Sequence, residues 1–243
     1  MIASSTAPPR ALLFDVGMTL IHVDGHVLAE ELAIQGVTGV GGPDAVAALA
    51  LAAEARHFPL PRARDGDERV ALRWAQLLDA GPEPVVAAFR SAVRRPDLYG
   101  VLDPGAHEAL TALRAMDIEL AAVANAEGRL TEELAEFGLD QHFSVMIDSA
   151  VIGVEKPSPE IYHTACRALQ VDPQQCWFVG DSLINDVLGA RAAGVAHAIL
   201  YDPLELFTRL PGISRTSALR DIPPAVRAAR IAAGARGTER GAT

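Results

Sequence analysis

Five short apolar runs recur along the chain and predict strands that are covered on both faces. They are rich in Val, Ile, Leu and Phe, are bounded by turn residues, and span residues 11–16, 118–123, 143–147, 176–179 and 198–201. Between the later runs, apolar residues recur at helical spacing over residues 105–116, 129–137, 159–169 and 184–193. Alternating strands and helices predict βα units with right-handed crossovers. We therefore predict an α/β fold built on a doubly wound, Rossmann-like parallel sheet.

This alternation breaks after the first predicted strand. Residues 22–100 show no convincing strand, and their helical patterns, separated by Gly and Pro, cover residues 27–35, 43–56, 67–78 and 83–93. We therefore predict an α/β core formed by residues 1–21 and 101–222, with an all-helical subdomain, residues 22–100, inserted after the first strand. Residues 223–243 are rich in arginine and predict a flexible basic tail.

The composition excludes several classes of protein. The 243 residues are 50% hydrophobic and 21% charged, which excludes wholesale disorder, and they carry a formal net charge of −10. An acidic chain argues against nucleic acid as the main partner, because phosphate contacts need clustered Arg and Lys. The apolar stretches are too short to span a membrane, and the opening stretch MIASSTAPPR lacks the pattern of a secretory signal. The two cysteines, Cys166 and Cys176, are too few for a disulfide framework, so we expect free thiols and a cytoplasmic location.

Polar and small residues follow the predicted strands and mark a candidate site. The carboxyl ends of parallel strands share one edge of the sheet, so residues 15–20, 124–126, 153–157 and 180–186 are expected to converge there. They bring together the carboxylates of Asp15, Asp181 and Asp186 and the ammonium group of Lys156. Lys156 is the single lysine in a chain whose other basic residues are arginines, which suggests that this position requires a compact ammonium group.

These groups suit phosphoryl transfer. Clustered carboxylates repel one another and need a cation, and oxygen ligands with open positions suit Mg²⁺. A metal ion would keep Asp15 ionised, and an ionised carboxylate can attack phosphorus to form an aspartyl phosphate. Lys156 would balance the remaining negative charge, while the turn at residues 124–126 would present N–H groups to phosphate oxygens. We therefore expect Mg²⁺ as the cofactor and a small phosphorylated molecule as the substrate.

Two stretches, GVEKPSPEIY and VGDSLINDVLGARAAG, follow a strand that ends in Asp-x-x-x-Thr-Leu. With these motifs in this order, the chain resembles the haloacid dehalogenase-like hydrolase superfamily, with a helical cap inserted after the first strand. The resemblance covers roughly residues 11–201 and implies a phosphatase. It implies that Asp15 is the nucleophile, and that the metal ligands are Asp15, the backbone carbonyl of Gly17, and Asp181.

The resemblance also assigns supporting roles. Lys156 would pair with the carboxylates and with the transferred group, and Asp186 would act with it. Asn185 would support Lys156 and the waters on the metal ion, Ser182 would lie beside them, and Thr19 would shape the first loop. The phosphate would be bound by Ala124, Asn125 and Lys156. The helical insert would act as a lid that selects the substrate and excludes water.

The chain departs from this family pattern at two positions. Phosphatases of the family usually carry a second aspartate, two residues after the nucleophile, that acts as the general acid and base, and here that position is Gly17. General acid–base help is typically worth about 10²–10⁴-fold in rate. The second motif usually offers Ser or Thr to the phosphate, and here it offers Ala124. One lost donor of this kind costs on the order of 10²–10³ in rate.

Three explanations of these departures stay open. The first is a working phosphatase whose acid comes from elsewhere, with His22, Asp24 and His26 as candidates because they follow the first strand. The second is displacement at carbon, as in 2-haloacid dehalogenases, which also lack an aspartate at the Gly17 position and need no metal. The third is a weak or inactive relative that binds a ligand or partner through the old cleft.

Overall fold

The structure is a computed structural model that describes residues 7–60 and 63–240. The chain divides into two compact units. One unit is Ile21–Leu102, and the other holds the residues before Ile21 together with those from Asp103 onward. These are called the helical unit and the core unit below. The bounds of the helical unit lie close to the insert expected at residues 22–100, while its action as a lid stays a prediction.

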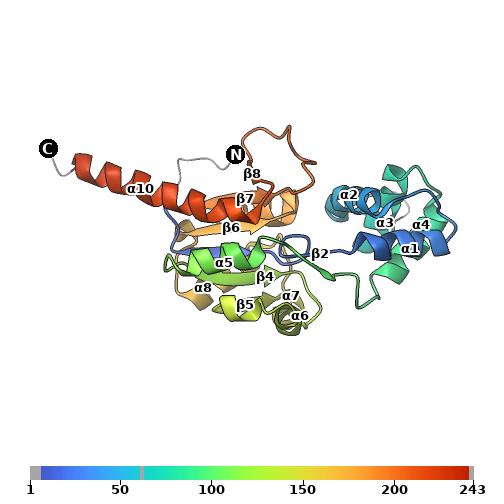
Figure 1. Cartoon of the computed structure of the whole chain (residues 1–243), viewed down its shortest axis with the longest axis horizontal. Helices are drawn as coiled ribbons and strands as arrows, with labels where there is room; N and C mark the ends of the chain where they lie inside the picture. Colours follow the sequence, from blue (N-terminus) through green and yellow to red (C-terminus); the bar gives the residue numbers. More distant parts are fainter. Residues whose placement is uncertain (1–6, 61–62, 241–243) are drawn as a thin grey trace. The chain divides into compact units, whose positions relative to one another are not determined.

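A six-stranded parallel sheet organises the core unit (Figure 1). Its strands are β1 (Ala11–Phe14), β4 (Glu119–Ala124), β5 (Val145–Asp148), β6 (Cys176–Gly180), β7 (His197–Tyr201) and β8 (Ser214–Thr216). The strand order is β5-β4-β1-β6-β7-β8, and every neighbouring pair is parallel. The predicted α/β class with a doubly wound parallel sheet is confirmed. The short polar strand β8 was not expected, since it has no apolar run.

Helices join these strands as the sequence pattern predicted, with local differences. They are α5 (Ala106–Arg114), α6 (Leu130–Glu136), α7 (Ser149–Ile152), α8 (Pro159–Leu169) and α9 (Gly189–Ala192). One large apolar cluster shows why α8 forms where it does, because Ile161, Tyr162 and Cys166 pack with every second residue of the strands, such as Leu13, Val123 and Phe178. Alternate residues of the strands and one face of α8 therefore pack together in one core.

The predicted flexible tail is wrong for the part of it that the structure describes. Residues Ile222–Arg240 form helix α10, and Ile222, Val226 and Ala229 on it are buried. Two prolines follow Ile222, but proline is tolerated in the first turn of a helix, where its missing N–H has no helical partner. Figure 1 shows that α10 continues beyond the sheet. Residues 241–243 of the expected tail lie outside the described residues.

The described residues of the helical unit form four α-helices, close to the four helices that the sequence predicted, and one short 3-10 helix, Glu54–His57. The α-helices are α1 (Gly25–Ile34), α2 (Gly42–Ala53), α3 (Gly66–Leu77) and α4 (Pro82–Ala92). Trp74 on α3 is fully buried, and its indole N–H donates to the carbonyl of Ala45 at 3.0 Å. A short antiparallel ribbon at the two ends of this unit was not expected: β2 (Ile21–His22) pairs with β3 (Val101–Leu102), and only His22 of this ribbon falls within residues 22–100, where we expected no strand.

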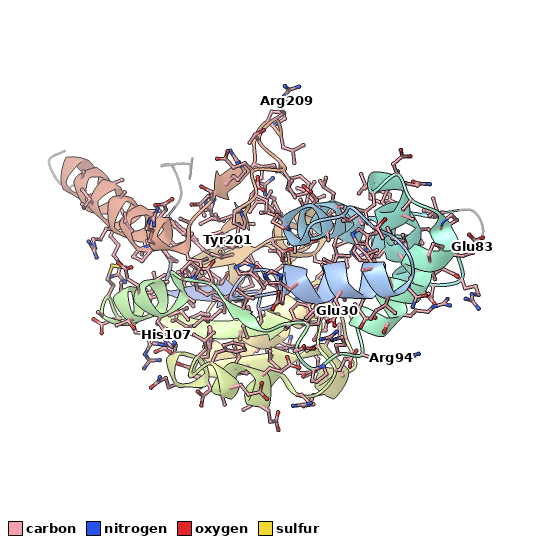
Figure 2. The ribbon with its side chains drawn as sticks, turned by 45° about the vertical axis from the view of Figure 1, so that its right-hand side comes forward. Glu30, Glu83, Arg94, His107, Tyr201 and Arg209 are labelled. Carbon is pink, nitrogen blue, oxygen red and sulfur yellow. The ribbon has the colours of Figure 1, made fainter. Side chains whose placement is uncertain are left out.

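A loop between β7 and β8 projects from the core unit and carries Arg209 near its tip (Figure 2). Buried Asp202 holds the base of this loop. Its carboxylate accepts from the N–H groups of Leu206, at 2.8 Å, and Phe207, at 3.0 Å, and it pairs with Arg215 at 2.9 Å. Among the described residues, no helix combines the length and the apolar character needed to cross a membrane.

Candidate active site

Four charged side chains meet at the carboxyl edge of the core sheet. Asp15 directly follows β1, and Asp181 directly follows β6. One carboxylate oxygen from each of Asp15, Asp181 and Asp186 lies within 4.8 Å of the others. The Nζ of Lys156 lies 2.8 Å from Asp186 Oδ1 and also donates to Asp15 Oδ1. The structure thus brings together residues from distant parts of the chain, as expected from the sheet topology.

Strand pairing positions Asp15, and a close contact with Gly180 positions Asp186. The N–H of Asp15 donates to the carbonyl of Val179 at 2.9 Å, so β1 and β6 stay paired up to the site. Gly180, the last residue of β6, is required by packing. A Cβ atom at that position would lie 2.3 Å from Asp186 Oδ2, which no real contact allows. The glycine therefore lets the carboxylate of Asp186 pack directly against the strand end.

The segment after β6 forms a π-helical turn, Leu183–Leu188, where the sequence pattern had predicted a regular helix. Turns of this kind are frequent at functional sites. Ser182 caps the turn, since its hydroxyl accepts from Asn185 N at 3.1 Å, and its own N–H donates to Asp186 Oδ2 at 2.9 Å. The hydroxyl of Tyr162, on α8, donates to the carbonyl of Asn185. Sequence reasoning missed this role of Tyr162, although it ends the stretch GVEKPSPEIY that marked the family.

Burial and mutual repulsion set the protonation behaviour of the site. Burial, followed by the charges of Asp15 and Asp186, raises the pKa of Asp181 well above its usual value. Burial likewise raises the pKa of Asp186 to about 7, against the opposing charge of Lys156. Burial alone would lower the pKa of Lys156, but the charges and hydrogen bonds of Asp15 and Asp186 raise it above its usual value. These raised pKa values mean that one ammonium group does not offset the cost of keeping all three carboxylates ionised together.

These residues fit a hard divalent cation. Three carboxylates against one ammonium group leave an excess of negative charge, and carboxylate oxygens are the ligands that Mg²⁺ prefers. The hydroxyl of Thr19 lies 3.2 Å from Asp15 Oδ2 and 3.4 Å from Asp181 Oδ1, so it links two of the three predicted metal ligands. Asn185 Oδ1 is buried and has no hydrogen-bond partner among the described residues. An unpartnered buried acceptor beside this cluster suits a water molecule held on such a cation.

The turn after β4 differs from the expected phosphate site in one respect. Ala124 is buried and pairs with Asp148 of the neighbouring strand. Both polar groups of the Asn125 side chain are used within the chain, because Oδ1 accepts from Lys156 N at 2.7 Å and Nδ2 donates to Lys156 O at 3.0 Å. The amide of Asn125, predicted to bind phosphate, therefore binds the main chain of Lys156 here.

The candidates for the missing general acid all lie beyond the loop that follows β1. Gly17 is partly exposed and carries no side chain, and Met18 beside it adopts a left-handed conformation with φ of 62°. Asp24 acts as the N-cap of α1, and its carboxylate accepts from His26 N at 2.8 Å. His22, Asp24 and His26 all belong to the helical unit, so an acid role for any of them stays a prediction.

Solved structures share this fold. The magnesium-bound HAD hydrolase YfnB of Bacillus subtilis aligns with a TM-score of 0.65 at 22% identity, over 90% of this chain and 99% of that one. The L-2-haloacid dehalogenase RSc1362 aligns with a TM-score of 0.61 at 18% identity, over 91% and 100%. At these identities the likeness shows the fold alone, and it includes enzymes with different reactions.

Sequence relatives lead to the same family. Bovine (Bos taurus) haloacid dehalogenase-like hydrolase domain-containing protein 3 is 33% identical over 56% of this chain and 52% of its own length. A phosphoglycolate phosphatase of Chromobacterium violaceum is 40% identical over 54% and 57%. The chain thus spans little more than half the length of these two relatives. A phosphoserine phosphatase of Thermus thermophilus is 30% identical over 76% of this chain and 86% of its own. The family model of the haloacid dehalogenase-like hydrolases matches residues 9–194, and the chain belongs to that family.

Proposed function

We propose that this protein is a Mg²⁺-dependent phosphatase that hydrolyses a small phosphomonoester through an aspartyl phosphate on Asp15. The observation that carries the proposal is the cluster of three carboxylates, with one oxygen from each within 4.8 Å of the others, two of which contact a single buried ammonium group. Relatives named as phosphoglycolate and phosphoserine phosphatases support a small phosphorylated acid as the substrate. The two cysteines are free thiols, which fits our further proposal of a cytoplasmic location.

In this proposal, Asp15 and Asp181 hold Mg²⁺ through their carboxylates, and Gly17 holds it through its backbone carbonyl. When bound, the ion would neutralise the carboxylates and the incoming phosphate, and so stabilise the charge that develops during transfer. Lys156 contributes a second positive charge through its contact with Asp15 Oδ1. Asp186 keeps that ammonium group in place through its 2.8 Å contact.

Two displacement steps make up the reaction, each with one bond formed and one bond broken. A carboxylate oxygen of Asp15 attacks phosphorus, an O–P bond forms, and the bond from phosphorus to the substrate oxygen breaks. The departing oxygen takes up a proton, and water then attacks the aspartyl phosphate to release inorganic phosphate and restore Asp15. Gly17 offers no carboxyl group to move these protons, so we expect proton transfer to limit turnover in this protein.

A phosphate-release screen tests the proposal. The panel holds phosphoglycolate, phosphoserine and other small phosphomonoesters, each assayed with Mg²⁺ and with EDTA. We expect release only with Mg²⁺, and none from the Asp15→Asn variant. We also expect Gly17→Asp to raise turnover by about tenfold or more, since it restores a general acid at the position where the family carries one.

Three results would contradict the proposal. Phosphate release that survives Asp15→Asn would exclude Asp15 as the nucleophile. Chloride release from a 2-haloacid in EDTA would show displacement at carbon instead. Binding of phosphorylated ligands without turnover, in the parent chain and in Gly17→Asp alike, would identify an inactive relative with a binding role.

A further inference from the structure

The side chain of Asn125 makes two hydrogen bonds, and both go to the main chain of Lys156. Lys156 N donates to Asn125 Oδ1 at 2.7 Å, and Asn125 Nδ2 donates to Lys156 O at 3.0 Å. The two residues are 31 positions apart, so this contact joins the turn after β4 to the segment that precedes α8. An amide matched in this way to the N–H and C=O of one residue fixes both the position and the orientation of that residue's backbone.

The turn that carries Asn125 is itself anchored from the other side. The Ser149 hydroxyl accepts from Ala126 N at 3.1 Å and donates to Ala126 O at 3.2 Å. The Asp148 carboxylate accepts from Gly128 N at 2.9 Å. These contacts hold the backbone that follows Asn125, and the strand pairing of Ala124 with Asp148 holds the residue before it. Although Asn125 itself is exposed, both ends of its amide are bonded to Lys156, so this side chain is not free to swing toward a ligand while these bonds hold.

The residue that Asn125 holds in this way carries the ammonium group of the site. Lys156 is 4% exposed, and its Nζ contacts Asp15 and Asp186 and lies 5.5 Å from the centre of the Phe178 ring. A long lysine side chain reaches such a point only if its backbone starts from the right place. A displacement of about 1 Å in a positioning group can cost about 100-fold in rate.

We propose that Asn125 is a positioning residue, which sets the place of the Lys156 ammonium group through the Lys156 main chain and does not itself bind the substrate phosphate. The effect of Asn125 on turnover rests on the proposed function, whereas its effect on the position of Lys156 does not. The phosphate contacts of this turn then fall to backbone N–H groups other than that of Ala126, which is bonded to the Ser149 hydroxyl. This arrangement fits Ala124, which has no hydroxyl to offer.

The composition of the chain gives a direct readout. Lys156 is its single lysine, so protein grown with ¹³C-lysine gives NMR signals from one side chain only. The variants are Asn125→Ala, which loses both hydrogen bonds, and Asn125→Asp, which keeps only the acceptor for Lys156 N. Gln141→Ala is the matched control, since Gln141 is an exposed amide that donates to the carbonyl of Gly138 at 2.8 Å.

We expect the Cε signals of Lys156 to differ from those of free lysine in the parent chain and in Gln141→Ala. In Asn125→Ala they should shift toward the free-lysine position, and Asn125→Asp should lie between the two. Thermal unfolding followed by circular dichroism shows that each variant is folded at the NMR temperature. If Asn125→Ala does not fold, Asn125→Asp decides alone. Lys156 signals that stay unchanged in a folded Asn125 variant would overturn the proposal.

Kinetics separates positioning from direct phosphate binding. On the best substrate of the panel, we expect Asn125→Ala to lower kcat by about 10–100-fold, with KM within about twofold of the parent value. A raised KM with unchanged kcat and unmoved Lys156 signals would make Asn125 a phosphate ligand and refute the proposal. If the parent chain releases no phosphate at all, the proposed function fails, and the NMR arm still decides whether Asn125 positions Lys156.

Discussion

His197 is a buried histidine whose protonation should cost stability. It opens β7, is 8% exposed, and stacks edge-on against Trp177 with ring centres 5.0 Å apart. Its Nε2 has no hydrogen-bond partner among the described residues. Burial, with a smaller contribution from the charge of Arg191, lowers the pKa of His197 from 6.5 to about 4. The folded chain therefore favours the neutral ring, while the unfolded chain binds a proton as the pH falls below about 6.5.

The size of the effect follows from these two pKa values. Since the unfolded state takes up the proton first, the free energy of unfolding falls as the pH is lowered through the window between them. A group with pKa values of 6.5 and about 4 removes about 2 kcal/mol between pH 7 and pH 5, and about 3 kcal/mol in all once the pH is below 4. At pH 7 the cost is only a few tenths of a kcal/mol, because most of the unfolded chain is still neutral there.

The test compares the parent chain with His197→Phe and His197→Gln. Urea unfolding is measured at pH 7 and pH 5 and followed by circular dichroism. We expect the parent chain to lose about 2 kcal/mol more than either variant between the two pH values. His197→Phe keeps an aromatic ring against Trp177, and His197→Gln keeps a polar group, so agreement between them assigns the difference to titration. Equal losses in all three proteins would refute the reasoning.

The remaining predictions concern packing and the site. Gly180→Ala places a methyl group 2.3 Å from Asp186 Oδ2, so we expect a loss of about 1–3 kcal/mol in urea unfolding, and an unchanged midpoint would contradict the close approach. Thr19→Val removes the hydroxyl that bonds to the Asp15 carboxylate at 3.2 Å, which should cost about 1–3 kcal/mol and be largely restored by Thr19→Ser. Val226→Ala on α10 should cost about 2 kcal/mol, because Val226 is fully buried. Ile231→Ala, at a residue 74% exposed on the same helix, should change stability by less than about 0.5 kcal/mol. Equal effects of these two substitutions would mean that α10 does not pack as described.

The sequence predicted the parts of the fold whose residues are buried on a regular period. The strands of the sheet were visible because strands covered on both faces need uninterrupted apolar residues, and α8 because its apolar face packs on the sheet. Strand β8 was not predicted, because its three residues, Ser214–Thr216, form no apolar run. Helix α10 was not predicted, because two prolines and several arginines are typical of a flexible tail. The burial of Val226 depends on packing against residues far away in the sequence, which the local pattern does not show.

The site could be predicted as a set of residues but not as a set of contacts. Asp15, Lys156 and Asp181 were found because the ends of parallel strands share an edge, a rule that needs only strand positions. The orientation of Asn125 could not be found, since its partner is a main-chain group 31 positions later, and every residue except proline offers the same N–H and C=O. The π-helical turn was also missed, because the side-chain pattern of Leu183–Leu188 also suits an ordinary helix.

The central place of β1 bears on how the chain folds. Ala11 pairs with Glu119 on one side and with Cys176 on the other. During synthesis, β1 is therefore made well before its two neighbours, β4 and β6. The entropy of closing the long loops between β1 and these strands slows their pairing. Asp15 comes close to Asp181 only when the second pairing, between β1 and β6, forms. Ribosome-bound fragments that end before residue 176 should consequently leave an apolar strand half-paired, a natural target for chaperones and proteases.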